Sequence, residues 1–248
     1  MARELGRSIA SGRTAEAHER GPGWVLKLFR EEIDLAVVRR EHGIAAAVFE
    51  ARAPAPRTGA IVSIGPPYGL EYERIEGVPL PHAMRAYPTK LLYYADPMAD
   101  TRLQLNSIET IEGVPLQRTT IEQRLSAEIA LDSETKIRVL SRLNELGMGS
   151  SLCHGDFHPE NIILQGNRAT VLDWTVASCG DASSDLAQTL VILNGYLETI
   201  GTHAPEADAL LQFIQRYLSR YLRSDPVSGE KYCAWVPIVA AARLSDFH

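Results

Sequence analysis

The fold can be inferred most directly from two neighbouring stretches, Leu152-Cys153-His154-Gly155-Asp156-Phe157-His158-Pro159-Glu160-Asn161-Ile162-Ile163-Leu164 and Val171-Leu172-Asp173-Trp174. Two short runs of β-prone residues, 162–164 and 169–172, flank the turn-like segment Gln165-Gly166-Asn167-Arg168. A polar, glycine-containing segment between two apolar runs is typical of a hairpin. The sequence therefore predicts a β-hairpin whose open end carries the polar residues of both stretches.

The register of this hairpin is expected to bring two metal ligands together. If Leu164 pairs with Ala169, then Asn161 lies opposite Leu172, because paired positions of an antiparallel hairpin keep a constant sum. Asn161 and Asp173 then meet at the open end, within about one cross-strand distance of 5 Å. An amide oxygen and a carboxylate suit a hard divalent cation that keeps waters and takes phosphate oxygens. We expect Mg²⁺ to bind there.

Asp156 lies on the loop that enters the hairpin. Asp156 and Asn161 have the Asp-x-x-x-x-Asn spacing of a kinase catalytic loop, and Asp173 follows where a metal-binding acid is expected. Asp156 is then placed to accept the proton of an attacking hydroxyl and to orient it toward a γ-phosphate. A surface turn whose Asp and Asn only cap backbone groups would leave these matched spacings unexplained.

A lysine–glutamate pair is expected in the first part of the chain. As a strand, residues 24–29 place Lys27 on a face with apolar groups, and Glu41 falls within the apolar stripe of a helix expected from Glu31 to about Arg52. Each charge alone could be solvated. A carboxylate on the packed side of a helix is costly unless it is paired, so Lys27 and Glu41 predict a strand lysine held by a helix glutamate.

His154, Asp156 and His158 alternate along the chain and offer a different interpretation. On one face of an extended segment they could hold a transition metal, as in a metal-dependent hydrolase or phosphatase. The other histidines are scattered: His18, His42, His82, His203 and His248. The hydrolase interpretation also gives Lys27 and the hairpin no role. We expect His154 to bond to the backbone near the loop.

Composition and periodicity indicate a two-lobed α+β protein. Strands surround one helix in the first 75 residues, and helical periodicity dominates the rest. We expect a small N-terminal lobe over 1–75 and a larger, mainly helical lobe over 76–248. Within the second lobe, Thr119-Thr120-Ile121-Glu122 has the pattern of a capping box, and Asp132 or Ser133 is expected to cap the following helix.

Charge and cysteine content exclude several classes of protein. The formal net charge is −6 and the pI is about 5.7, which argues against nucleic acid as a partner. No run approaches the ~20 apolar residues of a membrane helix, and the first residues lack the apolar core of a secretory signal, so a cytoplasmic location is expected. The odd, scattered cysteines predict reduced and buried thiols: Cys153, Cys179 and Cys233.

Several motifs closely resemble those of the aminoglycoside-phosphotransferase and choline-kinase family. The strongest are His154 to Ile162, Leu172-Asp173-Trp174 and Gly180-Asp181-Ala182-Ser183-Ser184-Asp185-Leu186-Ala187. Residues 8–16 look like the family's nucleotide loop, and Glu73-Arg74-Ile75-Glu76-Gly77 resembles the stretch that links its lobes. The resemblance covers nearly the whole chain in order. It implies a protein-kinase-like fold, with a nucleotide-binding lobe over 1–75 and a catalytic and substrate-binding lobe over 76–248. It also implies transfer of the γ-phosphate of ATP or GTP to a small-molecule hydroxyl.

The resemblance also implies residue roles. Asp156 would be the catalytic base, and Asp185 would be structural. Asn161 and Asp173 would bind magnesium, Lys27 would contact the α- and β-phosphates, Glu41 would orient Lys27, and backbone groups near Glu73 and Ile75 would bond the nucleotide base. Only Gly12 lies near the tip of the first loop, so backbone amides and the hydroxyls of Ser11 and Thr14 must cover the phosphates.

The acceptor stays open at this point. A polyamine-like antibiotic would require a strongly acidic pocket, but acids exceed bases only slightly after residue 180. Choline, a sugar, an amino alcohol, a macrolide or another metabolite hydroxyl fits the family equally well. A nucleotide-binding regulatory module without turnover would normally lack the base or a magnesium ligand, and neither is missing.

Overall fold

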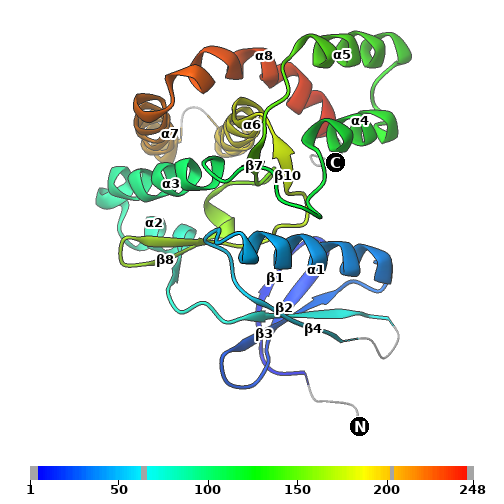
Figure 1. Ribbon diagram of the computed structural model, residues 1–248. Helices are drawn as coiled ribbons and strands as arrows, with labels where there is room; N and C mark the ends of the chain where they lie inside the picture. The colour runs from blue at the N-terminus through cyan, green and yellow to red at the C-terminus, as the bar shows by residue number, and fades with distance from the viewer. Residues whose placement is uncertain (1–4, 63–65, 202–203, 245–248) are drawn as a thin grey trace.

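The computed structural model describes residues 5–62, 66–201 and 204–244, which form an antiparallel sheet followed by a mainly helical part (Figure 1). The five-stranded sheet has the order β1-β2-β3-β5-β4. Its elements are β1 (Ser8–Ser11), β2 (Ala15–Glu19), β3 (Trp24–Phe29), α1 (Leu35–Glu50), β4 (Thr58–Val62) and β5 (Gly69–Glu73). The predicted α+β architecture with a small N-terminal sheet is thereby confirmed.

Helix α1 lies between the sheet and the helical part (Figure 1). Asp34 caps its start, since its carboxylate accepts from the amide of Ala36 at 2.6 Å. One face of the helix is buried and consists of Val38, Glu41, Ile44, Ala45 and Val48. Ile44 and Val48 belong to the same hydrophobic cluster as residues of the helical part, so the two parts share one core.

The C-terminal part consists of helices with two small sheets between them. Its helices are α2 (Leu80–Ala86), η1 (Pro88–Lys90), α3 (Leu91–Asn106), α4 (Gln117–Ala127), α5 (Ser133–Glu145), η2 (Pro159–Asn161), α6 (Ala182–Ile200), α7 (Pro205–Ser224) and α8 (Pro226–Ala242). Its strands are β6 (Val78–Pro79), β7 (Ser151–Cys153), β8 (Ile162–Gln165), β9 (Arg168–Val171) and β10 (Ser178–Gly180). None of the described helices is long and apolar enough to span a membrane.

The hairpin forms in the predicted register. β8 pairs with β9, and Leu164 lies opposite Ala169. The amide of Leu172 donates to the carbonyl of Asn161 at 2.8 Å, which extends the pairing by one residue beyond the strands. The turn itself is only Gly166-Asn167, with Gly166 at a φ of 60°. This left-handed backbone favours glycine in a two-residue hairpin turn.

Two predictions outside the site are wrong. Helix α4 begins at Gln117 with Leu116 as its N-cap, so Thr119 and Thr120 lie inside the helix instead of capping it. Thr120 instead donates its hydroxyl to the carbonyl of Leu116. Cys153 and Cys179 are buried as expected, but Cys233 is exposed on α8. The cap of α5 is Asp132, one of the two expected residues.

Candidate active site

Lys27, Glu41 and Asp173 form one charged cluster between the sheet and the helical part. Lys27 Nζ donates to Glu41 Oε1 at 2.8 Å and to Asp173 Oδ1 at 3.1 Å. The Lys27 ammonium also lies 5.3 Å from the ring centroid of Phe29, the apolar neighbour on its strand face. Strand β3 and helix α1 thus place the Lys27 ammonium at Asp173, two residues after the end of β9. The structure brings these three predicted residues together.

The cluster favours the charged forms of Lys27 and Asp173. Burial alone would lower the pKa of Lys27, but the carboxylates of Asp173 and Glu41 outweigh burial and raise it. Burial alone would raise the pKa of Asp173, but the Lys27 ammonium outweighs burial and lowers it.

Asp173 also has a φ of 59°, a left-handed conformation that is uncommon for a residue other than glycine. Such strain is concentrated at functional positions.

Two polar residues that the sequence did not reveal complete this cluster. The Tyr72 hydroxyl donates to Glu41 Oε1 at 2.7 Å. The Thr175 hydroxyl lies 2.9 Å from Glu41 Oε2 and also bonds to Asp173 Oδ1. A hydroxyl carries one proton, so Thr175 donates to one of these carboxylates at a time. Tyr72 comes from β5, and its contact with Glu41 could not be inferred from sequence spacing.

Asp156 lies on the loop between β7 and η2 and accepts hydrogen bonds on both carboxylate oxygens. Arg243 Nη2 donates to Oδ1 at 2.8 Å. His158 Nε2 lies 3.3 Å from Oδ2, and Asn161 Nδ2 donates to the same oxygen at 3.2 Å. Burial would raise the pKa of Asp156, but the His158 hydrogen bond and the charge of Arg243 outweigh burial and lower it far below its usual value. Asp156 is therefore a carboxylate at neutral pH.

The Asn161 side chain is oriented by Asp156. Its Nδ2 donates to the Asp156 carbonyl at 2.9 Å as well as to the carboxylate. Both partners are oxygens that only accept, so the amide nitrogen must face Asp156. The amide oxygen then faces away from Asp156 and is the atom that could ligate a cation. An amide oxygen and the Asp173 carboxylate are hard donors of the kind that magnesium takes, and the binding of an ion by both residues stays a prediction.

His154 and His158 do not form the alternative metal site. His154 is fully buried, its Nε2 lies 2.9 Å from the Leu172 carbonyl, and its Nδ1 accepts from the Asp156 amide at 3.2 Å. Burial lowers the pKa of His154. His158 Nδ1 lies 3.0 Å from the Tyr196 hydroxyl, and His158 Nε2 lies within hydrogen-bond distance of Asp156 Oδ2. Within the described ranges, no three His, Cys, Asp or Glu residues gather to hold a metal.

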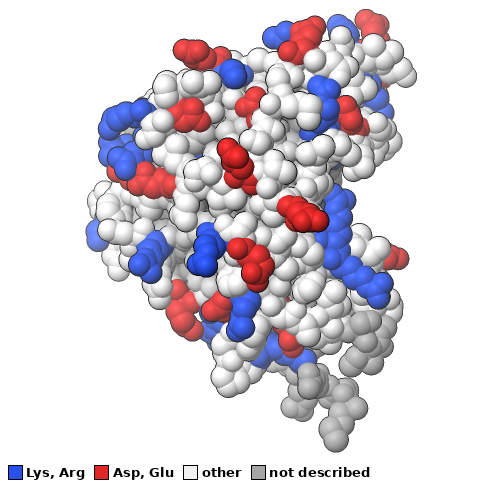
Figure 2. Space-filling view, viewed as in Figure 1, with Lys and Arg blue, Asp and Glu red and all other residues white. Residues whose placement is uncertain are grey.

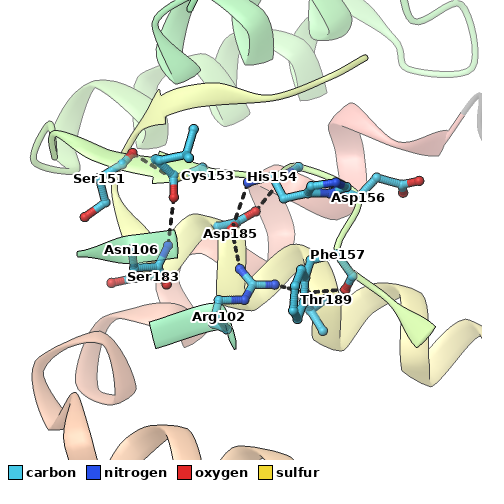
Figure 3. A network of polar contacts seen from close by, with 12 residues as sticks. Arg102, Asn106, Ser151, Cys153, His154, Asp156, Phe157, Ser183, Asp185 and Thr189 are labelled. Atoms are coloured by element: carbon cyan, nitrogen blue, oxygen red, sulfur yellow. Dashed lines mark hydrogen bonds and ion pairs between the residues drawn. The ribbon is translucent and has the colours of Figure 1, made fainter. Parts of the chain in front are cut away.

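A buried ion pair anchors the loop that carries Asp156. Asp185 of α6 bonds to the Arg102 guanidinium of α3, and both side chains are fully buried (Figure 3). Asp185 also accepts from the amides of His154 at 3.1 Å and Gly155 at 2.8 Å. The Arg102 guanidinium lies 4.4 Å from the ring centroid of Phe157. The backbone that carries Asp156 is therefore fixed by a charge pair between two helices.

The predicted nucleotide loop is the turn between β1 and β2. The Gly12 amide donates to the Ala15 carbonyl at 2.8 Å, which closes the turn. Arg30 reaches the turn from the end of β3 and donates to the Ser11 hydroxyl at 3.3 Å and to the Gly12 carbonyl at 3.1 Å. Thr14 is exposed, and its carbonyl accepts from the Arg30 amide at 2.8 Å. Contacts from these residues to a nucleotide stay a prediction.

The predicted base-binding residues lie where the sheet continues into the helical part. Glu73 is the last residue of β5, and its amide donates to the Arg57 carbonyl at 2.8 Å. Ile75 is half-buried in the segment between β5 and β6. Contacts from Glu73 and Ile75 to a base also stay a prediction.

The molecular outline is indented between α4 and α1, and acidic and basic side chains are interspersed over the face shown (Figure 2).

Comparisons with known proteins identify a family and a shared fold. The phosphotransferase enzyme family matches residues 6–227 of the chain. The crystal structure of aminoglycoside-3'-phosphotransferase of type VIII is similar at a TM-score of 0.64 and 21% identity, covering 95% of this chain and 91% of that one. A search of curated proteins finds no match.

Two further solved structures share the fold. One is a thermostable mutant of aminoglycoside phosphotransferase APH(4)-Ia in ternary complex with ADP and hygromycin B, at a TM-score of 0.59 and 16% identity, covering 96% of this chain and 94% of that one. The other is a choline/ethanolamine kinase family protein from Mesorhizobium loti, at a TM-score of 0.57 and 17% identity, covering 100% and 82%.

The family match and this fold define a phosphotransferase that acts on a hydroxyl group of a small molecule. The match covers most of the chain and includes the loop that carries Asp156, the β8–β9 hairpin and Lys27. The chain belongs to the phosphotransferase enzyme family.

Proposed function

We propose that this protein transfers the γ-phosphate of ATP or GTP to a hydroxyl of a small molecule, with Asp156 as the catalytic base. The observation that supports this most strongly is the single polar cluster that joins strand β3, helix α1 and the β8–β9 hairpin. Lys27 Nζ bonds to both Glu41 and Asp173, and Asn161, whose side chain bonds to Asp156, pairs with the residue before Asp173. Each of these groups has a distinct task in phosphoryl transfer.

The nucleotide is proposed to lie between the sheet and the helical part. Its base would bond to backbone groups near Glu73 and Ile75, and its phosphates would lie under the turn that contains Ser11, Gly12 and Thr14. The related phosphotransferase solved with ADP and hygromycin B supports a nucleotide and a small-molecule acceptor in this fold. Lys27 would neutralise phosphate charge while Glu41 keeps its ammonium in place.

Magnesium is proposed to bind between Asn161 and Asp173. The Leu172–Asn161 backbone bond at 2.8 Å keeps the two residues at one end of the hairpin. The Asn161 amide oxygen and the Asp173 carboxylate are hard donors of the kind that Mg²⁺ takes, together with water and phosphate oxygens. The ion would supply charge neutralisation on the transferred phosphoryl group.

Asp156 is proposed to orient the acceptor hydroxyl and to accept its proton. Its lowered pKa keeps it ionised, and its neighbours hold the carboxylate in one position. Positioning of the nucleophile in line with the phosphorus, together with charge stabilisation, accounts for most catalysis in this kind of reaction. The acceptor is proposed to be an alcohol of a small metabolite or antibiotic, since aminoglycoside phosphotransferases and a choline/ethanolamine kinase family protein share the fold.

The test is transfer from radiolabelled ATP and GTP, with Mg²⁺, to a panel of acceptors. The panel contains aminoglycosides, macrolides, choline, ethanolamine, homoserine and simple sugars. The Asp173→Asn variant, purified in the same way, excludes a contaminating kinase. Label transferred by the natural protein and not by the variant is the expected result. Tight nucleotide binding with no transfer to any acceptor would contradict the proposal and would favour a nucleotide-binding regulatory module.

A further inference from the structure

The residue at the end of α8, the last described helix, contacts the loop that carries Asp156. Arg243 follows α8 directly as its C-cap residue and is only 8% exposed. Its guanidinium makes two bonds to consecutive loop residues, from Nη1 to the Gly155 carbonyl at 2.9 Å and from Nη2 to Asp156 Oδ1 at 2.8 Å. The phosphate-transfer groups described above include no residue from this part of the chain.

The bonds to Asp156 leave only a limited number of directions for an acceptor. An ionised carboxylate has about four lone-pair positions on its two oxygens. His158 and Asn161 both lie against Oδ2, whereas Arg243 occupies one position on Oδ1. The remaining position is therefore on Oδ1, beside the Arg243 guanidinium. A hydroxyl that gives its proton to Asp156 must approach from this side.

The bond to the Gly155 carbonyl fixes the peptide that precedes Asp156. Gly155 has a φ of 77°, and a Cβ at this position would lie 2.7 Å from the Val176 carbonyl oxygen, so the backbone is confined on that side. Its amide is held by Asp185 and its carbonyl by Arg243. Arg243 therefore restrains both the backbone and the carboxylate of the proposed catalytic base.

We propose that Arg243 is a positioning residue for phosphoryl transfer, which turns the Asp156 carboxylate so that the open side of Oδ1 faces the acceptor hydroxyl. This inference rests on the proposed function of Asp156. A planar guanidinium can bond a carbonyl and a carboxylate at fixed angles, whereas an ammonium acts as a point charge on a flexible stem. The identity of the residue as arginine is therefore part of the inference.

The test compares Arg243→Ala and Arg243→Lys with Arg220→Ala. Arg220 is a matched control, because it also bonds a carboxylate, that of Asp100, but on the exposed outer side of α7 and α3. Steady-state transfer to an acceptor identified in the panel, or hydrolysis of Mg·ATP and Mg·GTP by water, gives kcat and the nucleotide KM. Thermal unfolding of each variant is measured alongside.

Arg243→Ala is expected to lower kcat about 100-fold with little change in nucleotide KM, because a displacement of about 1 Å in a reacting group has an effect of this size. Guanidinium ion, added to Arg243→Ala at a concentration too low to denature the protein, is expected to restore part of kcat. The kcat of Arg243→Lys is expected to stay below that of the natural protein. Unchanged kcat in Arg243→Ala would overturn the inference. The inference would also be overturned if Arg243→Ala lost kcat, nucleotide binding and thermal stability together and guanidinium ion restored none of them, since this indicates a structural role.

A structural readout separates this inference from the proposed function. If the natural protein neither transfers phosphate nor hydrolyses nucleotide, the proposed function fails. Crystal structures of the natural protein and Arg243→Ala then test the positioning itself. A rotated or disordered Asp156 carboxylate in the variant supports the role of Arg243, and an unchanged carboxylate overturns it.

Discussion

Lys27 and Asp173 are 146 residues apart in the sequence, yet Lys27 Nζ donates to Asp173 Oδ1 at 3.1 Å. The bond joins the strand of the N-terminal sheet to the residue after the hairpin. The same ammonium is held by Glu41, which is 1% exposed. The proposed phosphate contact and the proposed metal ligand are thus preassembled around one cation.

Lys27→Met is expected to lower kcat about 100-fold, because it removes a fixed positive charge from the site where the phosphates are expected. Steady-state transfer with ATP and GTP measures this effect. Lys90→Met is the matched control, since Lys90 lies over the Tyr87 ring at 5.1 Å and contacts none of the site residues described above. Equal turnover of the two variants would show that Lys27 does not contact the phosphates.

Asp173→Asn is expected to abolish the dependence of nucleotide binding on magnesium. In the natural protein, calorimetric titration should give tighter ATP or GTP binding with Mg²⁺ than without it. The variant lacks the carboxylate charge that would ligate the ion, so the two titrations should coincide. Asp100→Asn serves as a control on the exposed α3–α7 surface. A magnesium effect that persists in Asp173→Asn would place the ion elsewhere.

Asp185→Ala is expected to lower the free energy of unfolding by about 3–5 kcal/mol, because it leaves the buried Arg102 guanidinium without its counter-charge. Asp100→Ala removes a bond to Arg220 at the surface, where solvent screens the charges, and should have a much smaller effect. Urea denaturation of both variants measures the difference. Similar losses would mean that the Arg102–Asp185 pair contributes no more than a surface pair.

The free energy of unfolding is expected to decrease as the pH falls below 6.5, and His154 accounts for part of this decrease. Its pKa is lowered from 6.5 by burial, so below pH 6.5 the unfolded chain binds a proton that the folded protein does not. The contribution is complete above pH 6.5 and is lost as the pH falls toward the folded pKa. In His154→Gln this residue no longer titrates, and the slope of unfolding free energy against pH between 6.5 and 5 should decrease. An identical slope would show that His154 does not titrate as described.

Local patterns in the sequence were sufficient for the hairpin and for the lysine–glutamate pair. Once the turn places Leu164 opposite Ala169, strand geometry places Asn161 opposite Leu172, and the structure has both pairings. The Lys27–Glu41 bond follows from the alternation of a strand, the period of a helix and the cost of burying an unpaired carboxylate. These constraints act over short stretches, so a single sequence contains them.

Contacts between distant elements could not be predicted in the same way. Tyr72 and Arg243 bond to Glu41 and Asp156 only because β5 and α8 pack where they do, and nothing in their local sequence indicates a partner. The capping pattern at Thr119 failed for the related reason that residues from Gln117 onward already form α4, so a locally favourable cap was not used. The exposure of Cys233 likewise depends on how α8 is packed.

The most direct test of the central proposal is the single-turnover rate of phosphate transfer by Asp156→Asn, measured with saturating nucleotide, Mg²⁺ and an acceptor from the panel. The substitution keeps the shape of the side chain and removes its charge and its basicity. The rate is expected to fall about 10²–10⁴-fold while the nucleotide Kd stays unchanged, as for the loss of a general base. A rate within a few-fold of the natural protein would contradict the assignment of Asp156 as the catalytic base.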